Sequence, residues 1–566
     1  ADAAWPLREH GRRLVAAEEA SRTAADRHDI VVVLDRSVVR LFEDGSSETR
    51  VHRIVRLDSE RAVATRGHVE IPERATILTL RSIAPDGSVL PAHERHGPSG
   101  YALGGPLPGR YVEVEYAVAD PASGMFSGGA VLPPFFFAAA DGPLRRAELL
   151  VVHPRSVAVR FDAGPGAPPA QTAAVEGLSI LRWVARDVAP APLEPWAPDP
   201  EDALPNVRVC AGCSVERAAA HIAERLRRAG RTAPEMADLV RSHPDRRDLY
   251  ASIQADVVSA PSPHDTAASV FLRRRGDRTM LLYHLERLAG RDVEVWHAAP
   301  LGRGDPPPGL WFPGDYAVPL LRSGDVWIYA DEDGVPFGVL PPNVAGRPAI
   351  RVAPSFAEGV VGAGRESGAT EYDIRFERGA AGGWTARIAV RLRGLPAVVL
   401  RQSRGSTAAR AEREARTFAL WMFDPAAAID EIALEIPEDG ETTPSVTAGV
   451  MLHGVRGPHE PPRLPMRWVS RFAFMPWRSQ ALVLPVGVAE EWTISYPPDP
   501  TPAVLAAPAR IETPFGAFRQ RVERDDTGAI VVRRTASVPV RRIEPADYPA
   551  FRAFAARVDA ASETAP

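Results

Sequence analysis

The chain has 566 residues and a mass of 61.1 kDa, which at about 150 residues per domain predicts three or four domains. Hydrophobic residues make up 45% of the chain and charged residues 25%, which excludes a globally disordered or fibrous protein. Its 67 basic and 72 acidic residues leave a formal charge of −5, so we expect no nucleic-acid partner, which would require a basic excess.

The sequence contains no lysine, so arginine supplies every basic residue counted. The chain therefore lacks the amine that forms a Schiff base and the cation of a phosphate-binding loop. This excludes a pyridoxal enzyme and a Walker-type NTPase, and we expect no cofactor. No stretch reaches the roughly eighteen consecutive apolar residues that a membrane span needs, so no transmembrane segment is predicted.

The first third of the chain is predicted to be β-rich. An alanine-rich segment with charges on one side predicts an N-terminal helix within 1–26. Short β-branched runs separated by turn residues follow, and residues 111–118 have an alternating pattern in which glutamates interrupt apolar residues. These patterns predict a sandwich-like domain over 27–190. The proline-rich run over 191–206 is predicted to be a linker.

The middle segment, 207–350, mixes helices and strands and is predicted to be an α+β core. Asp277 precedes a helix whose leucines recur at the spacing of one buried face, and a strand and a hairpin follow it. Residues 351–566 return to β-rich patterns and end in a closing helix. The predicted fold class is therefore multidomain and mostly β, with a central α+β core between two β-sandwich-like domains.

Five motifs stand in a fixed order along these segments: Arg110-Tyr-Val-Glu-Val-Glu-Tyr, Gly142-Pro-Leu-Arg-Arg-Ala-Glu-Leu-Leu-Val-Val-His-Pro, Arg274-Arg-Gly-Asp, Leu281-Leu-Tyr-His-Leu-Glu-Arg-Leu-Ala-Gly and Arg541-Arg-Ile-Glu-Pro-Ala-Asp-Tyr-Pro-Ala-Phe-Arg. The motifs and their order resemble the exported bacterial transglutaminase-like family, in which a papain/transglutaminase-like core lies between two β-rich domains. The resemblance implies a periplasmic or otherwise exported protein, a cytoplasmic location being the alternative.

Active members of that family carry a cysteine, a histidine and an aspartate. The cysteine follows Arg-x-Gly-Asp at the start of the core helix, where the positive end of the helix lowers the pKa of a thiol. Here Arg278 follows Gly276-Asp277, and Tyr316 stands where the family has its histidine. Only the acid remains, as Asp331. The resemblance thus implies degenerate catalytic positions, and we predict a non-catalytic protein, a pseudoenzyme, that binds a peptide, an envelope component or a partner protein.

Two alternative functions stay open. Cys213 precedes a predicted helix at Ser214, where a thiol can be activated, so the chain could be a residual cysteine acyltransferase or peptidase. The candidate bases for that thiol are His221, His264, His284 and His297. The other alternative is a structural subunit of a larger assembly. Cys210 and Cys213 also fit a local disulfide or two plain thiols, and no metal site is predicted because the chain has no further cysteine.

Three aromatic motifs have both a packing and a binding interpretation, and an arginine cluster has a solvated and a binding one. Trp311-Phe312 and 327–329 fit either core packing or a binding cleft, and 135–137 fits either a buried strand or an exposed docking loop. The arginines of 273–275 together with Arg278 form a cluster that is either solvated or able to bind a carboxylate.

Overall fold

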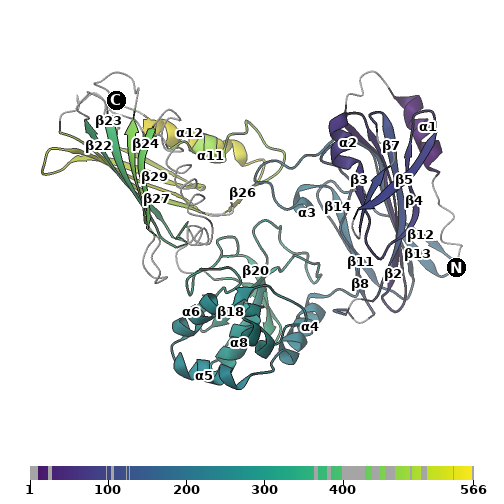
Figure 1. The fold of residues 1–566 in the computed structure, drawn as a ribbon, viewed down its shortest axis with the longest axis horizontal. Coiled ribbons are helices and arrows are strands. Elements are labelled where there is room, and N and C mark those ends of the chain that lie inside the picture. The colour runs from purple at the N-terminus through teal and green to yellow at the C-terminus, as the bar shows by residue number, and fades with distance from the viewer. Residues whose placement is uncertain are drawn as a thin grey trace. The chain divides into compact units, whose positions relative to one another are not determined.

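The computed structural model describes residues 10–22, 28–96, 99–103, 107–122, 124–126, 128–362, 368–378, 384–394, 396–397, 428–435, 445–452, 464, 466–484, 487–498, 507–539 and 541–563, with the backbone alone for 92–96, 428–435 and 445–452. The chain folds into several β-sheets with fewer helices, so the predicted multidomain, mostly β fold class is confirmed (Figure 1). It divides into an N-terminal unit, residues 1–221 with 306–313, and a C-terminal unit, residues 222–305 with 314–566.

The N-terminal unit is built on a ten-stranded sheet with the strand order β12-β13-β10-β1-β2-β7-β4-β5-β6-β3. Its long central strands are rich in valine and isoleucine, which favour the extended backbone. The strands are β1 (Ile30–Leu41), β2 (Ser47–Leu57), β3 (His68–Glu70), β4 (Thr76–Ile83), β5 (Val89–His96), β6 (Gly100–Leu103), β7 (Arg110–Asp120), β10 (Leu144–Pro154), β12 (Gln171–Val175) and β13 (Leu178–Val188), with the helix α2 (Glu60–Arg66) between β2 and β3.

A second, smaller sheet packs on one face of the first. It consists of β8 (Ala130–Val131), β9 (Phe135–Phe136), β11 (Val159–Ala163) and β14 (Asn206–Ala211), and α3 (Pro200–Ala203) precedes β14. The core between the sheets contains Trp183, Leu149 and Val209. Strand β14 belongs to this unit, although the sequence boundary at 207 assigns it to the core, because it pairs with β11, β8 and β9. The other domain boundaries stay predictions.

The opposite face of the large sheet buries charged side chains rather than exposing them. Glu148, with a side chain 2% exposed, accepts bonds from Arg36 at 2.9 Å, Arg146 at 2.6 Å and Arg182 at 2.6 Å. Helix α1 (Gly11–Ser21) docks on this face through Glu18, which contacts the fully buried Arg56 at 2.7 Å. Within the described residues the N-terminal helix runs over Gly11–Ser21, and 1–9 and 23–26 of the predicted segment lie outside them.

The C-terminal unit begins with helices around α8, followed by a five-stranded antiparallel sheet of order β19-β18-β17-β20-β21. Helices α5, α6 and α7 contact α8, whose leucines are buried. The elements are α4 (Val215–Arg228), which begins in the N-terminal unit, α5 (Pro234–Ser242), α6 (Arg246–Asp256), β15 (Val258–Ser259), α7 (Ala267–Arg273), β16 (Arg275–Gly276), α8 (Arg278–Leu288), β17 (Glu294–Ala298), β18 (Val318–Ser323), β19 (Val326–Ile328), β20 (Pro348–Ala353) and β21 (Ala357–Val360).

The rest of this unit is an eight-stranded sheet of order β24-β25-β23-β22-β27-β30-β29-β28, whose core includes residues of α12 and α11. Asp559 of α12 caps α11 by accepting the backbone N–H groups of Trp468 at 2.6 Å and Val469 at 2.9 Å. The elements are β22 (Thr370–Arg378), β23 (Trp384–Leu392), β24 (Ala428–Glu435), β25 (Ser445–Leu452), α11 (Trp468–Phe472), β26 (Leu482–Leu484), β27 (Val488–Tyr496), β28 (Ala509–Thr513), β29 (Gly516–Arg524), β30 (Ile530–Val538), β31 (Arg541–Ile543) and α12 (Tyr548–Glu563). Among the described helices, none combines the length and apolarity needed to cross a bilayer.

Candidate functional site

The N-terminus of α8 is where the sequence places the degenerate catalytic position. Asp277 caps the helix, since its Oδ1 accepts the N–H of Met280 at 2.8 Å, as the sequence predicts. The preceding Gly276 has φ +145°, and a Cβ there would lie 2.5 Å from a methyl of Val270 and 2.8 Å from Asp265 Oδ2. The Gly-Asp pair therefore fixes the sharp entry into the helix, and Arg278 becomes its first residue.

The Arg278 side chain is 3% exposed, and its guanidinium is bonded to protein acceptors. Its Nε donates to the carbonyl of Val257 at 2.5 Å, and Nη1 donates to Gln254 Oε1 at 3.2 Å. Its Nη2 lies 2.5 Å from a carboxylate oxygen of Asp333. A cation at the positive end of a helix is unfavourable by itself, and these partners offset that cost. The guanidinium thus ties the C-terminal end of α6 and the 330–333 loop to α8.

Asp331, the acid implied by the resemblance, lies beside the same helix end. Its Oδ1 accepts the hydroxyl of Thr279 at 2.9 Å. Burial raises the pKa of Asp331 to about 6, and the nearby Asp277 carboxylate adds to the shift, while Thr279 and Arg278 oppose it. Burial also raises the pKa of Asp277. Helix α6 orients this loop, because Gln254 donates to the carbonyl of Ala330 at 3.0 Å.

Tyr316, which stands where the family has its histidine, lies beside His297. Its carbonyl oxygen lies 3.3 Å from Nδ1 of His297, and burial raises the pKa of the Tyr316 phenol to about 12. Burial lowers the pKa of His297 to about 4 and also lowers the pKa of His284, whose Nε2 lies 3.0 Å from the carbonyl of Leu226. The resemblance implies three catalytic positions, at Arg278, Tyr316 and Asp331. The described contacts connect Arg278 and Asp331, through the first turn of α8.

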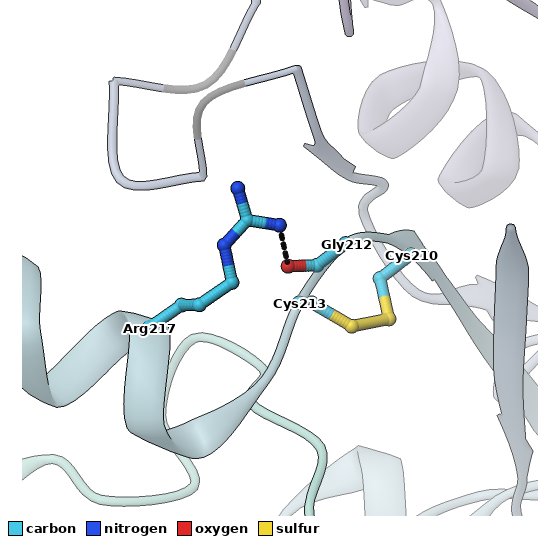
Figure 2. The surroundings of a disulfide bond; sticks show 4 residues. All are labelled: Cys210, Gly212, Cys213 and Arg217. Atoms are coloured by element: carbon cyan, nitrogen blue, oxygen red, sulfur yellow. Dashed lines mark hydrogen bonds between the residues drawn. A yellow bond between two sulfur atoms is a disulfide. The ribbon is translucent and has the colours of Figure 1, made fainter. Parts of the chain in front are cut away.

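Cys213, the alternative nucleophile, forms a disulfide with Cys210 (Figure 2). Both residues are buried, at 0% and 2% exposure, and their Cα atoms are 5.9 Å apart. Arg217 on the first turn of α4 donates to the carbonyl of Gly212 at 3.0 Å and holds the loop between them (Figure 2). Because the chain has two cysteines, the thiol that a cysteine enzyme requires is not free in this structure.

This disulfide is expected to stabilise the end of β14. In the chain-entropy treatment, a bridge that closes so short a loop contributes about 2 kcal/mol. Replacing both Cys210 and Cys213 with alanine should therefore lower the free energy of local opening at β14 by about that amount, measured by hydrogen exchange of its amides. Dithiothreitol should lower the same quantity in the wild type but not in the double variant. Equal exchange in all four samples would contradict a stabilising bridge.

The remaining predicted motifs are mostly packed. Phe312 is 1% exposed and lies under the Arg208 guanidinium, while Trp327 packs against Trp296 with ring centroids 5.5 Å apart. Among the predicted arginines, Arg273 pairs with Asp265 at 2.9 Å, whereas Arg274 and Arg275 are exposed. Core packing is therefore the interpretation that fits both aromatic motifs, and the arginines do not converge with the buried Arg278.

A groove in the N-terminal unit is a second candidate site. It has a volume of about 610 Å³ and is lined by β1, β2, β7 and the 132–141 segment. In the predicted 135–137 motif, Phe135 and Phe137 are buried in the sheet core, and both Phe135 and the half-buried Phe136 line the groove. Alternating strand patterns do not predict this groove, since they do not show which parts of a sheet face stay uncovered. Among the described residues, no group of three or more potential metal ligands is placed to hold a metal.

Comparisons with known proteins bear on the fold. The model of a domain of unknown function with a solved structure, DUF3858, matches residues 469–565. A crystal structure described as a "putative protease" from Parabacteroides distasonis ATCC 8503 aligns with a TM-score of 0.61 and 14% identity, covering 93% of this chain and 96% of that chain. At this identity the similarity concerns the fold alone.

Matches to two peptidases are much weaker. The M1 zinc metallopeptidase from Deinococcus radiodurans has a TM-score of 0.20 and 12% identity, over 33% of this chain and 43% of that chain. The Legionella pneumophila aminopeptidase A in complex with aspartic acid has a TM-score of 0.21 and 9% identity, over 34% and 22%. Neither carries a functional argument. No curated protein sequence matches this chain.

Proposed function

We propose that this chain is a non-catalytic, transglutaminase-like protein that acts by binding a peptide or a partner protein. The observation that carries the proposal is the bonding of Arg278 at the N-terminus of α8, the position that the resemblance gives to the nucleophile. A guanidinium stays protonated and offers no nucleophilic lone pair to a carbonyl. Its buried acceptors also hold it in place, so the helix end serves to stabilise the fold.

The neighbouring groups support the same proposal. Thr279 is 3% exposed and donates its hydroxyl to Asp331, so its oxygen is not presented to a substrate. Activation of such a hydroxyl would need a general base of the kind that histidine supplies in nucleophile–base pairs. Both cysteine sulfurs are held in the disulfide. Asp331 and the nearby Asp277 can exchange protons, but the described contacts of Asp331 include neither a thiol nor a histidine that it could orient as a base.

The proposal includes an exported location, and the disulfide supports it. Disulfides persist in oxidising compartments such as the periplasm and are rare in the cytosol. In the native source, fractionation should recover the chain outside the cytoplasm with Cys210 and Cys213 oxidised. Recovery in the cytosol with both thiols reduced would contradict this location.

The experiment for the function measures acyl transfer and proteolysis with the full chain. Incorporation of a biotinylated amine into casein and release of peptides from labelled casein should stay at background, before and after reduction with dithiothreitol. The Cys213→Ala variant should behave as the wild type does, and Cys210→Ala is its matched control. Turnover that appears on reduction and disappears only in Cys213→Ala would favour the cysteine-enzyme alternative instead.

A further inference from the structure

The groove of the N-terminal unit exists because the second sheet covers only part of the first. The buried residues of the inter-sheet core come from β1, β10 and β13 on the large sheet, and the described members of that cluster include none from β2 or β7. Another core cluster, which includes Ala62 of α2, covers Val112 and Val114 on the same face of β7. The rest of this face, from Thr49 to Val55 on β2 with Tyr116 and Val118 on β7, lines the groove beside β8 and β9, the edge of the small sheet. A cavity of about 610 Å³ is in the size range of ligand-binding sites.

The floor of the groove is a ladder of rungs, each formed by side chains that lie opposite one another on adjacent strands. One rung carries opposite charges, and the others are apolar or mixed. In order along β1, the rungs are Val39, Thr49 and Val118; Ser37, Val51 and Tyr116; Asp35 and Arg53; and Val32 and Val55. Successive same-face residues of a strand are about 7 Å apart, which is also the spacing of alternate side chains in an extended peptide.

The charges at the groove present arginine to solvent more than aspartate. In the floor pair, Arg53 Nη2 lies 2.6 Å from Asp35 Oδ2, and the side chains are 52% and 16% exposed. The pair of Arg66 with Asp141 has exposures of 54% and 31%. A third pair at the groove, Arg74 with Asp120, shows 62% and 35%. The three carboxylates thus lie deeper than their partners, and a ligand meets guanidinium groups first.

The edge strand beside the groove is unsuited to pairing with another backbone. Residues 133 and 134 are both prolines, and they separate β8 from β9. Proline has no N–H group and is one of the features that block strand addition at a sheet edge. A ligand in this groove would therefore be recognised by its side chains.

We propose that this groove binds an extended peptide segment with apolar side chains at alternate positions and one acidic side chain among them. The apolar side chains would pack against Val51 and Val55, the half-buried valines on either side of Arg53 in β2, and the carboxylate would bond to the exposed face of Arg53. A peptide strand fits the sheet-to-sheet spacing of about 10 Å above an open sheet face. This inference rests on the proposed binding function and gives it a site and a ligand chemistry.

The test uses fluorescein-labelled Val-Ser-Val-Ser-Glu-Ser-Val and the same peptide with lysine in place of glutamate, with binding to the full chain followed by fluorescence anisotropy. The glutamate peptide should bind at least about tenfold more tightly. Exchanging the floor charges, Asp35→Arg with Arg53→Asp, keeps the pair and should reverse this preference. Val51→Asp should weaken binding of the glutamate peptide by about tenfold or more, while the matched control Val175→Asp on exposed β12 should not.

Equal binding of the two peptides, no binding of either, or a preference that survives the charge exchange would overturn the proposal. Tight binding of a fluorescent hexadecanoate that Val51→Asp abolishes, without peptide binding, would also overturn it in favour of an acyl ligand. Circular dichroism verifies that each variant is folded, and Val51→Asp provides an answer where the charge exchange does not fold. If the peptides do not bind, the groove proposal fails, but the expected absence of casein turnover still supports a non-catalytic function. Casein turnover would refute the non-catalytic function and would not alter the anisotropy result.

Discussion

Replacing Arg278 with alanine is expected to lower the free energy of opening at the N-terminus of α8 by about 3 kcal/mol. The substitution leaves the carbonyl of Val257 and the amide oxygen of Gln254 without a charged donor, and it opens a cavity in a buried site. Asp333 contributes less to the loss, since its side chain is 67% exposed and can be hydrated. Arg278→Met should cost about 2 kcal/mol, because it fills much of the volume and removes only the bonds.

Hydrogen exchange of the α8 and α6 amides measures this effect, since a multidomain chain gives no single unfolding free energy. Arg274→Ala is the matched control, because that residue lies four positions earlier and is exposed, and it should leave exchange of these amides unchanged. An Arg278→Ala variant with protection equal to that of the wild type would contradict the structural role and would weaken the function proposed for this helix end.

The local features of this site could be predicted from the sequence because short-range chemistry determines them. A glycine followed by aspartate before an apolar-periodic run predicts a sharp turn and a helix cap, and Gly276 and Asp277 provide both. The transglutaminase-like resemblance singled out Arg278 and Asp331, and both lie at the N-terminus of α8. It did not predict that Tyr316 would lie beside His297, since that contact joins a loop to a separate strand.

Features that depend on contacts between distant strands could not be predicted from the sequence. Alternation in 111–118 predicts a strand with an apolar and a polar face, yet Glu113 and Glu115 are only 2% and 3% exposed. Their cations come from other strands, including Arg81 on β4 and Arg50 on β2. No pattern within one strand reveals such partners. The assignment of β14 and the groove beside it depend in the same way on which strands meet, and a linear pattern does not contain that information.

The second large expected effect is a pH dependence of stability caused by Asp331. Its pKa is raised from 3.8 to about 6, so the folded chain binds this proton more tightly than the unfolded chain does. Between about pH 4 and pH 6 the folded state therefore carries more of the proton, and stability falls as the pH rises through that window. By the linkage relation the loss above the window is up to about 3 kcal/mol relative to a carboxyl with an ordinary pKa.

Asp331→Asn should remove this penalty, because the amide stays neutral and its oxygen can still accept the Thr279 hydroxyl. We expect the variant to exceed the wild type in local stability at α8 by up to about 3 kcal/mol near pH 7 and to match it near pH 4. The difference between the two proteins, measured by hydrogen exchange across that range, cancels titrations that they share. Asp325→Asn, in the exposed turn between β18 and β19, is the control and should show no such slope. A variant that is less stable near pH 7 would mean that the charged carboxylate stabilises this helix end. That result would refute the burial-driven pKa and identify the electrostatic attraction between Asp331 and Arg278 as the dominant interaction.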